Sequence, residues 1–165
     1  LPIYAACAYD DPVKSLILKK FSYDTLACKQ LANLIIDFVP FETIKADFLI
    51  PVPLHWSRFA WRGYNQAYLI AKQLSKKLDI PIINIVKRKH RTIFQSRLSP
   101  NQRQKNVETA FSIKKNFIFN NPIKDKNIVI IDDLFTTGAT VKSVAQTLAI
   151  LQPASMSIAV ACRTI

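Results

Sequence analysis

Two hydrophobic patterns alternate along the chain: short, nearly continuous apolar runs, and segments whose apolar residues recur about every three to four positions. The first is typical of strands buried on both faces of a sheet, and the second of helices with one apolar face. The apolar runs predict strands at Ile3–Tyr9, Phe48–Pro53, Ile82–Val86, Ala110–Ile113, Phe117–Phe119, Ile128–Ile131 and Ser157–Cys162. The helical spacing predicts helices that start near Asp11-Pro12 and that span Tyr23–Phe38, Asn65–Leu78 and Thr140–Leu151.

This alternation predicts the α/β class, with a mostly parallel central sheet that helices flank on both faces. The chain has 165 residues, a length that suits one domain with a single core. In parallel sheets, ligands bind beyond the carboxyl ends of the strands. We therefore expect the segments after Pro53, Val86 and Ile131 to meet at one edge of the sheet and to form the functional site.

The segment VIIDDLFTTGAT, residues 129–140, is the most informative one. It joins an apolar strand to two acids, then to a hydroxyl-rich turn with Gly138, and then to a helix. The chain has only 2 glycines, where an average usage of about 7% would give roughly a dozen. Gly138 therefore predicts a backbone with positive φ or a close approach to a ligand. A helix that begins at such a turn favours an anion at its N-terminus.

Asp132 and Asp133 are expected to leave the sheet where this strand ends. Adjacent carboxylates at that position can accept hydrogen bonds from vicinal sugar hydroxyls or hold a hydrated magnesium ion. The hydroxyls of Thr136, Thr137 and Thr140 and the amides of the turn can surround one phosphate. The segment therefore predicts a site that holds a sugar phosphate at both ends.

Two other interpretations of this segment are a helix cap after a surface turn and the magnesium-binding strand of a nucleotide hydrolase. The second would need the phosphate-binding motif G-x-x-x-x-G-K-[ST], which the chain lacks. A P-loop enzyme is therefore excluded.

The net charge of +12 predicts attraction to polyanions, whether nucleic acid, phosphorylated metabolites or an acidic protein. Cys7, Cys28 and Cys162 are isolated in the sequence and predict buried thiols rather than a disulfide framework or a zinc site. His55 and His90 are too few for a metal cluster. No apolar run approaches the roughly 20 residues of a membrane span, and the first residues lack the pattern of a signal peptide. We expect a cytoplasmic protein.

The strand, acid pair and T-T-G-A-T loop resemble the signature of type I phosphoribosyltransferases, which bind 5-phosphoribosyl 1-pyrophosphate. The resemblance implies that Asp132 and Asp133 bind the 2- and 3-hydroxyls of the ribose. It implies Mg²⁺ as a cofactor that the ligand carries and that reaches the two acids through water. The loop residues that it assigns to the 5-phosphate are Thr136, Thr137, Gly138, Ala139 and Thr140.

Three further blocks are similar to the ComF proteins of bacterial competence. They are PVPLHWSR (51–58) with RGYNQA (62–67), R-x-x-R-T-x-x-Q-S-x-L-S (88–99), and R-x-x-N-V (103–107) with Ala110-Phe111. The resemblance spans about residues 48–163 and implies one phosphoribosyltransferase-like domain over residues 1–165, with a hood of N-terminal helices at about 1–45 and a core at about 46–165. Many ComF relatives also carry an N-terminal zinc module, so the chain belongs to a shorter subgroup or the module lies before Leu1.

The resemblance also implies two basic loops that bind pyrophosphate. The first supplies Leu54, His55, Arg58 and Arg62. The second spans Lys87–Arg97 and contributes catalytic candidates that act with the acid pair, namely Arg88, Arg91 and Thr92. Cations at these positions would neutralise the charge that develops on the leaving group. The alternative interpretation is a solvated basic surface.

Trp56, Phe59, Trp61 and Tyr64 alternate with arginines in the first basic loop. Such residues can stack the bases of single-stranded DNA or pack the loop against its own core.

Three functions follow from the resemblance. The first is a magnesium-dependent phosphoribosyltransferase with an unidentified acceptor. The second is a non-catalytic ligand-binding module that assists the uptake or processing of single-stranded DNA with a helicase-like competence protein. The third is a regulator that senses the ligand without converting it.

Overall fold

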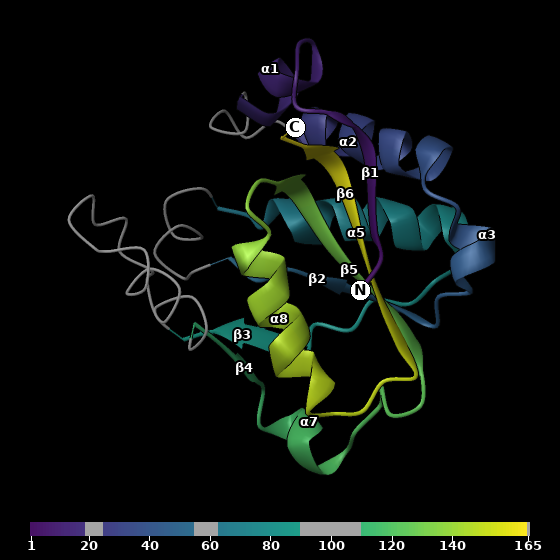
Figure 1. The fold of residues 1–165 in the computed structure, drawn as a ribbon, viewed down its shortest axis with the longest axis vertical. Coiled ribbons are helices and arrows are strands. Elements are labelled where there is room, and N and C mark those ends of the chain that lie inside the picture. Colours follow the sequence, from purple (N-terminus) through teal and green to yellow (C-terminus); the bar gives the residue numbers. More distant parts are fainter. Residues whose placement is uncertain (19–24, 55–62, 90–109, 165) are drawn as a thin grey trace.

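A parallel sheet of four strands, in the order β1-β6-β5-β2, forms the centre of the computed structural model (Figure 1). The structure describes residues 1–18, 25–54, 63–89 and 110–164. The strands of the sheet are β1 (Ile3–Ala8), β2 (Phe48–Pro51), β5 (Asn127–Phe135) and β6 (Ser155–Arg163). At the outer edge of β2, its residue Leu49 forms a single parallel bridge with Ile82. The predicted α/β class with a mostly parallel sheet is confirmed.

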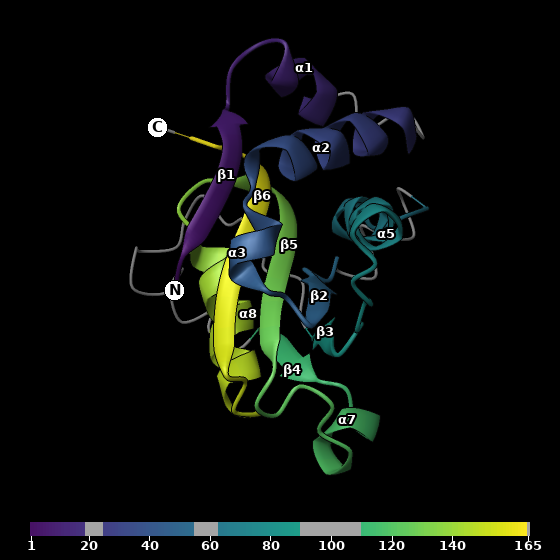
Figure 2. The ribbon, with the colours of Figure 1, turned by 90° about the vertical axis from the view of Figure 1, so that its right-hand side faces the viewer.

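Helices cover both faces of the sheet: α2 (Thr25–Phe38) and α5 (Gln66–Leu78) lie on one face, and α8 (Ala139–Ala149) lies on the other (Figure 2). Successive side chains of a strand point to opposite faces. Ile128 and Ile130 therefore pack in the core cluster that contains α8 residues, whereas Val129 and Ile131 pack in the cluster with residues of α2 and α5. This explains why the middle of β5 is apolar at every position.

The smaller elements are α1 (Val13–Leu18), α3 (Phe41–Ile44), α7 (Asn116–Phe119) and an antiparallel pair of strands, β3 (Val86–Arg88) and β4 (Phe111–Ile113). Val86 and Phe111 are buried in the same cluster as the inner face of α8. Their burial holds the small sheet beside the central one. Residues 1–45 contribute β1 to the central sheet as well as α1, α2 and α3, and the domain boundary near residue 46 stays a prediction.

Three sequence expectations for strands are wrong in detail. Phe117–Phe119 belongs to a helical turn, because the amides of Phe117 and Ile118 donate to the carbonyls of Lys114 and Lys115. Ile82–Val86 is not a continuous strand, since Ile82 makes one bridge and β3 starts at Val86. The strand at Ile128–Ile131 continues to Phe135, where β6 still provides a partner.

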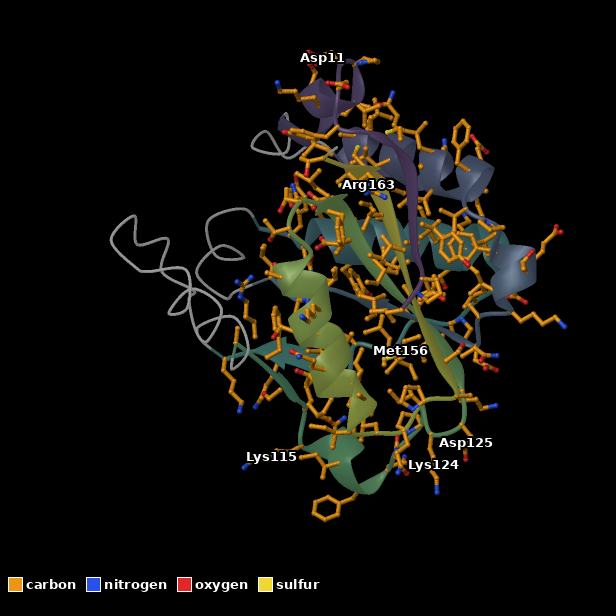
Figure 3. The ribbon with its side chains drawn as sticks, viewed as in Figure 1. Asp11, Lys115, Lys124, Asp125, Met156 and Arg163 are labelled. Atoms are coloured by element: carbon orange, nitrogen blue, oxygen red, sulfur yellow. The ribbon has the colours of Figure 1, made fainter. Side chains whose placement is uncertain are left out.

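The carboxyl ends of β5 and β6 point to the same end of the molecule, and the loop from β5 into α8 lies there (Figure 1). Arg163 marks this end, whereas Lys115, Lys124 and Asp125 lie at the opposite end (Figure 3). Among the helices that the structure describes, none has the length and apolarity that crossing a bilayer requires.

Candidate functional site

The turn between β5 and α8 is built around Gly138. This residue occupies the N-cap position of α8 with φ 73° and ψ 0°, in the left-handed region. A Cβ at this position would lie 2.5 Å from Cζ of Phe135, so a side chain there would force the Phe135 ring to shift. The amide of Ala139 donates to Oγ1 of Thr137 at 3.5 Å. The positive φ that the sequence predicted for Gly138 is confirmed, and the close neighbour is a phenyl ring of the same loop.

The acid pair lies within the last residues of β5. Asp132 is the register partner of Val160, and the strand continues through Leu134 and Phe135, so the carboxylates do not leave the sheet at a strand end as expected. Both acids are half-buried. The amide of Asp133 donates to Oδ1 of Asp132 at 2.9 Å. This bond constrains the Asp132 carboxylate, and the two acids remain at the carboxyl end of the sheet.

Two cavities adjoin this segment. The larger has a volume of about 160 Å³ and is lined by Val52, Pro53, Leu54, Asn65, Gln66, Ala67, Arg88, Asp132, Asp133 and Thr140. The smaller, of about 30 Å³, follows the turn and is lined by Asp132, Leu134, Phe135, Thr136, Thr137, Gly138, Ala139, Thr140 and Val141. Asp132 and Thr140 line both cavities. The two cavities are therefore neighbours, and these two residues form the wall that they share.

Arg88 brings a positive charge to the larger cavity from the separate small sheet. It is the register partner of Phe111, and its Cζ lies 5.2 Å from the centre of the Phe111 ring. An arginine at this distance from an aromatic ring gains a cation–π attraction. Phe111 is buried, and this contact orients the half-buried Arg88.

Asn65 and Gln66 also line the larger cavity, although the sequence analysis gave neither a role at the ligand site. Asn65 occupies the N-cap position of α5, yet its side chain makes no capping hydrogen bond. Instead its Nδ2 donates to the carbonyl of Val52 at 3.0 Å and ties the start of α5 to the exit of β2. Gln66 is only 7% exposed. In the sequence, their position in the RGYNQA block was the signal that could have indicated a place at the ligand site.

Residues 64–165, more than half of the chain, match the family model of the phosphoribosyl transferase domain. The chain belongs to the phosphoribosyltransferase family. The predicted resemblance to type I phosphoribosyltransferases is confirmed by this match.

Curated relatives of this chain are named for competence or for DNA utilization. It is 42% identical to Competence protein F of Haemophilus influenzae over 62% of its own length and 44% of the relative. It is 35% identical to DNA utilization protein YhgH of Escherichia coli over 72% of its length and 50% of the relative. It is 37% identical to Competence protein ComFC of Bacillus subtilis, over 61% of its length and 37% of the relative. The ComF resemblance is thereby confirmed, and the chain spans at most about half the length of these relatives.

The structure places most of the predicted site residues together. Leu54, Arg88, Asp132, Asp133 and Thr140 line the larger cavity. The remaining loop residues line the smaller one: Thr136, Thr137, Gly138 and Ala139.

Other predicted residues lie outside the described part of the chain, and their roles stay predictions. They are His55, Arg58, Arg62, Arg91 and Thr92, together with Trp56, Phe59 and Trp61. Tyr64, which is described, packs against the core cluster beneath α5. This favours the packing interpretation for that aromatic residue.

The acid pair suits a magnesium ion shared with a phosphate ligand. Mg²⁺ usually keeps several waters and binds through one or two carboxylates plus substrate phosphates. Asp132 and Asp133 offer two adjacent carboxylates beside the larger cavity. Within the described ranges, no three His, Cys, Asp or Glu side chains gather as a metal site.

Proposed function

We propose that this chain binds 5-phosphoribosyl 1-pyrophosphate with Mg²⁺ and transfers the phosphoribosyl group to an acceptor, with release of pyrophosphate. The observation that carries the proposal is the shared wall of the two cavities. Because Asp132 and Thr140 line both, one ligand can place its 5-phosphate in the smaller cavity and its sugar and pyrophosphate in the larger. The family match to the phosphoribosyl transferase domain supports this assignment.

The smaller cavity has the properties of a phosphate site. Gly138 places the first amides of α8 beside it, and the helix of 11 residues directs its positive dipole end to the same place. Thr136 and Thr137, which carry hydroxyls, line it as well. The 5-phosphate would accept hydrogen bonds from these amides and hydroxyls.

The larger cavity combines acids with a cation, as the rest of the ligand requires. The carboxylates of Asp132 and Asp133 would accept hydrogen bonds from the two ribose hydroxyls. The Arg88 guanidinium can donate several N–H groups to phosphate oxygens. Arg88 lines the same cavity as the acids and would bind the pyrophosphate.

In the transfer, the bond between ribose C1 and the pyrophosphate oxygen breaks, and its electron pair leaves with pyrophosphate. A lone pair of the acceptor forms the new bond to C1. Negative charge grows on the leaving group, so the cation at Arg88 lowers the barrier by stabilising that charge. When bound, Mg²⁺ supplies further neutralisation of the same oxygens, and Asp132 and Asp133 would hold it through water.

Pyrophosphate release is the direct test of this proposal. The chain, with Mg²⁺ and 5-phosphoribosyl 1-pyrophosphate, is assayed against a panel of nucleobases, amines and single-stranded DNA. Turnover with any acceptor supports the transferase. Saturable ligand binding without turnover across the panel supports the binding module considered next, and absence of ligand binding removes both.

The second candidate is a ComF-like module that binds the same ligand and assists the uptake or processing of single-stranded DNA with a helicase-like partner. Two observations favour it: the net charge of +12 and relatives named for competence and DNA utilization. Contacts with DNA phosphates release counterions, so affinity for single-stranded DNA should fall steeply with salt. Salt-insensitive or undetectable DNA binding would contradict this candidate.

A further inference from the structure

Cys7 and Cys162 lie beside each other in the central sheet. They are register partners in the parallel pairing of β1 with β6, and their Sγ atoms are 3.6 Å apart. The odd number of cysteines and the lack of C-x-x-C spacing predicted thiols rather than a disulfide framework. What the spacing could not show is that the sheet brings Cys7 and Cys162, 155 positions apart, to neighbouring strands. Both thiols are free in the structure.

The backbone around the pair already suits a disulfide. Neighbouring strands lie about 4.8 Å apart, which falls within the roughly 4.4–6.8 Å between Cα atoms that disulfides allow. The sulfur atoms would have to approach from 3.6 Å to about 2.05 Å. Side-chain rotation can supply this movement while the strands stay in register.

The two thiols have unequal surroundings. Cys7 is half-buried, whereas Cys162 is fully buried. The Cys7 thiol donates to the carbonyl of Ala161 at 3.2 Å and lies within reach of the Cys162 sulfur. Burial, and then the neighbouring Cys7 thiol and the charge of Asp133, raise the pKa of the Cys162 thiol. A reagent from solvent therefore meets Cys7 first, and Cys162 can react only with its neighbour.

We propose that Cys7 and Cys162 form an oxidation site at which a small-molecule disulfide converts the pair into an intramolecular disulfide between β1 and β6. The Cys7 thiolate attacks one sulfur of the small-molecule disulfide, and the other sulfur leaves as a thiolate. Cys162 gives its proton to that thiolate and attacks Sγ of Cys7, which releases the second sulfur as a thiolate that takes up the proton lost earlier by Cys7. Two protein thiols are oxidised, and one disulfide is reduced to two thiols.

This site would make the attachment of an edge strand depend on redox state. β1 is the outer strand of the sheet, and β6 is the neighbour that connects it to β5 and the acid pair. The pair lies close enough to Asp133 for that carboxylate to influence the Cys162 thiol. The inference rests on the sheet geometry and on the burial of the two thiols, and it stands or falls independently of the ligand and the transfer reaction.

The test uses the folded chain and oxidised glutathione, followed by alkylation of remaining thiols, intact mass and peptide mapping. Of the 3 cysteines, the two in the pair should be lost to alkylation, with a loss of two hydrogens in mass and a peptide that joins Cys7 to Cys162. Cys28→Ser is the matched control and should form the same cross-link. Cys162→Ser should stop at a stable glutathione adduct on Cys7.

Two results would overturn the proposal. One is a glutathione adduct that persists on Cys7 in the unsubstituted chain while Cys162 stays alkylatable. The other is retention of all three thiols in the folded chain under conditions in which the chain unfolded in denaturant is oxidised.

Discussion

The ring of Phe135 occupies the space that a side chain at Gly138 would need, with Cζ 2.5 Å from the position of a Cβ. The same glycine has a φ of 73°, which side chains of L-residues rarely adopt. The turn is therefore bounded on one side by its own aromatic residue. Any other residue at this position would need a rare backbone conformation and a displaced Phe135 ring.

Gly138→Ala should lower the free energy of unfolding by about 1–3 kcal/mol, because it adds a strained φ and a steric clash. It should also weaken binding of 5-phosphoribosyl 1-pyrophosphate, because the added methyl group would displace the Phe135 ring and change the shape of the turn that lines the smaller cavity. Urea denaturation and calorimetric titration measure the two effects. Adding Phe135→Leu should recover part of the stability, because it relieves the clash but not the strain.

Gly63→Ala is the matched control, since Gly63 also has a positive φ of 76° and does not line either cavity. It should lose stability without the same loss of ligand affinity. Equal effects of the two substitutions on affinity would contradict a phosphate role for the turn at Gly138.

Asn65→Ala should lower the free energy of unfolding by about 1 kcal/mol, because the side chain donates a hydrogen bond to the Val52 carbonyl. Asn65→Asp separates this role from helix capping. Aspartate is a good N-cap but an ionised carboxylate cannot donate to a carbonyl. We expect Asn65→Asp to be at least as destabilising as Asn65→Ala in urea denaturation. Full stability of Asn65→Asp would mean that the residue acts as a cap.

Arg88→Met should weaken binding of 5-phosphoribosyl 1-pyrophosphate by about tenfold or more, the value of a charge-assisted hydrogen bond. Binding of ribose 5-phosphate, which lacks the pyrophosphate, should change little. Comparing the two affinities by titration therefore shows whether Arg88 contacts the pyrophosphate group of the ligand. Lys87→Met removes the same charge from the exposed neighbour in β3 and serves as control. If Arg88→Met lowered the affinity for both ligands equally, Arg88 would not be a contact of the pyrophosphate group.

Sequence patterns predicted the parts of the site that are local in the chain. The strand before Asp132, the turn at Gly138 and the helix that follows are encoded by neighbouring residues, and all are found as expected. The end of β5 was misplaced because strand length depends on pairing with β6, which follows later in the chain. Hydrophobicity alone could not show this pairing.

Sequence patterns also could not predict contacts between segments that are distant in the chain. The bond from Asn65 to the Val52 carbonyl joins two segments that are 13 positions apart in the chain, and no local pattern encodes it. The pairing of Cys7 with Cys162 needs the order of the strands in the sheet. The turn of α7 was mistaken for a strand because Phe117–Phe119 is apolar, although Phe119 is 95% exposed.

The most direct measurement of the central claim is the affinity of the double variant Asp132→Asn with Asp133→Asn for 5-phosphoribosyl 1-pyrophosphate in the presence of Mg²⁺. The control, Asp37→Asn with Glu42→Gln, removes the same two negative charges from exposed positions. Loss of two hydrogen bonds to carboxylates should weaken binding by roughly 100-fold or more in the site variant, with an unchanged fold by circular dichroism. The control should bind as tightly as the unsubstituted chain. Unchanged affinity in a folded site variant would contradict the account.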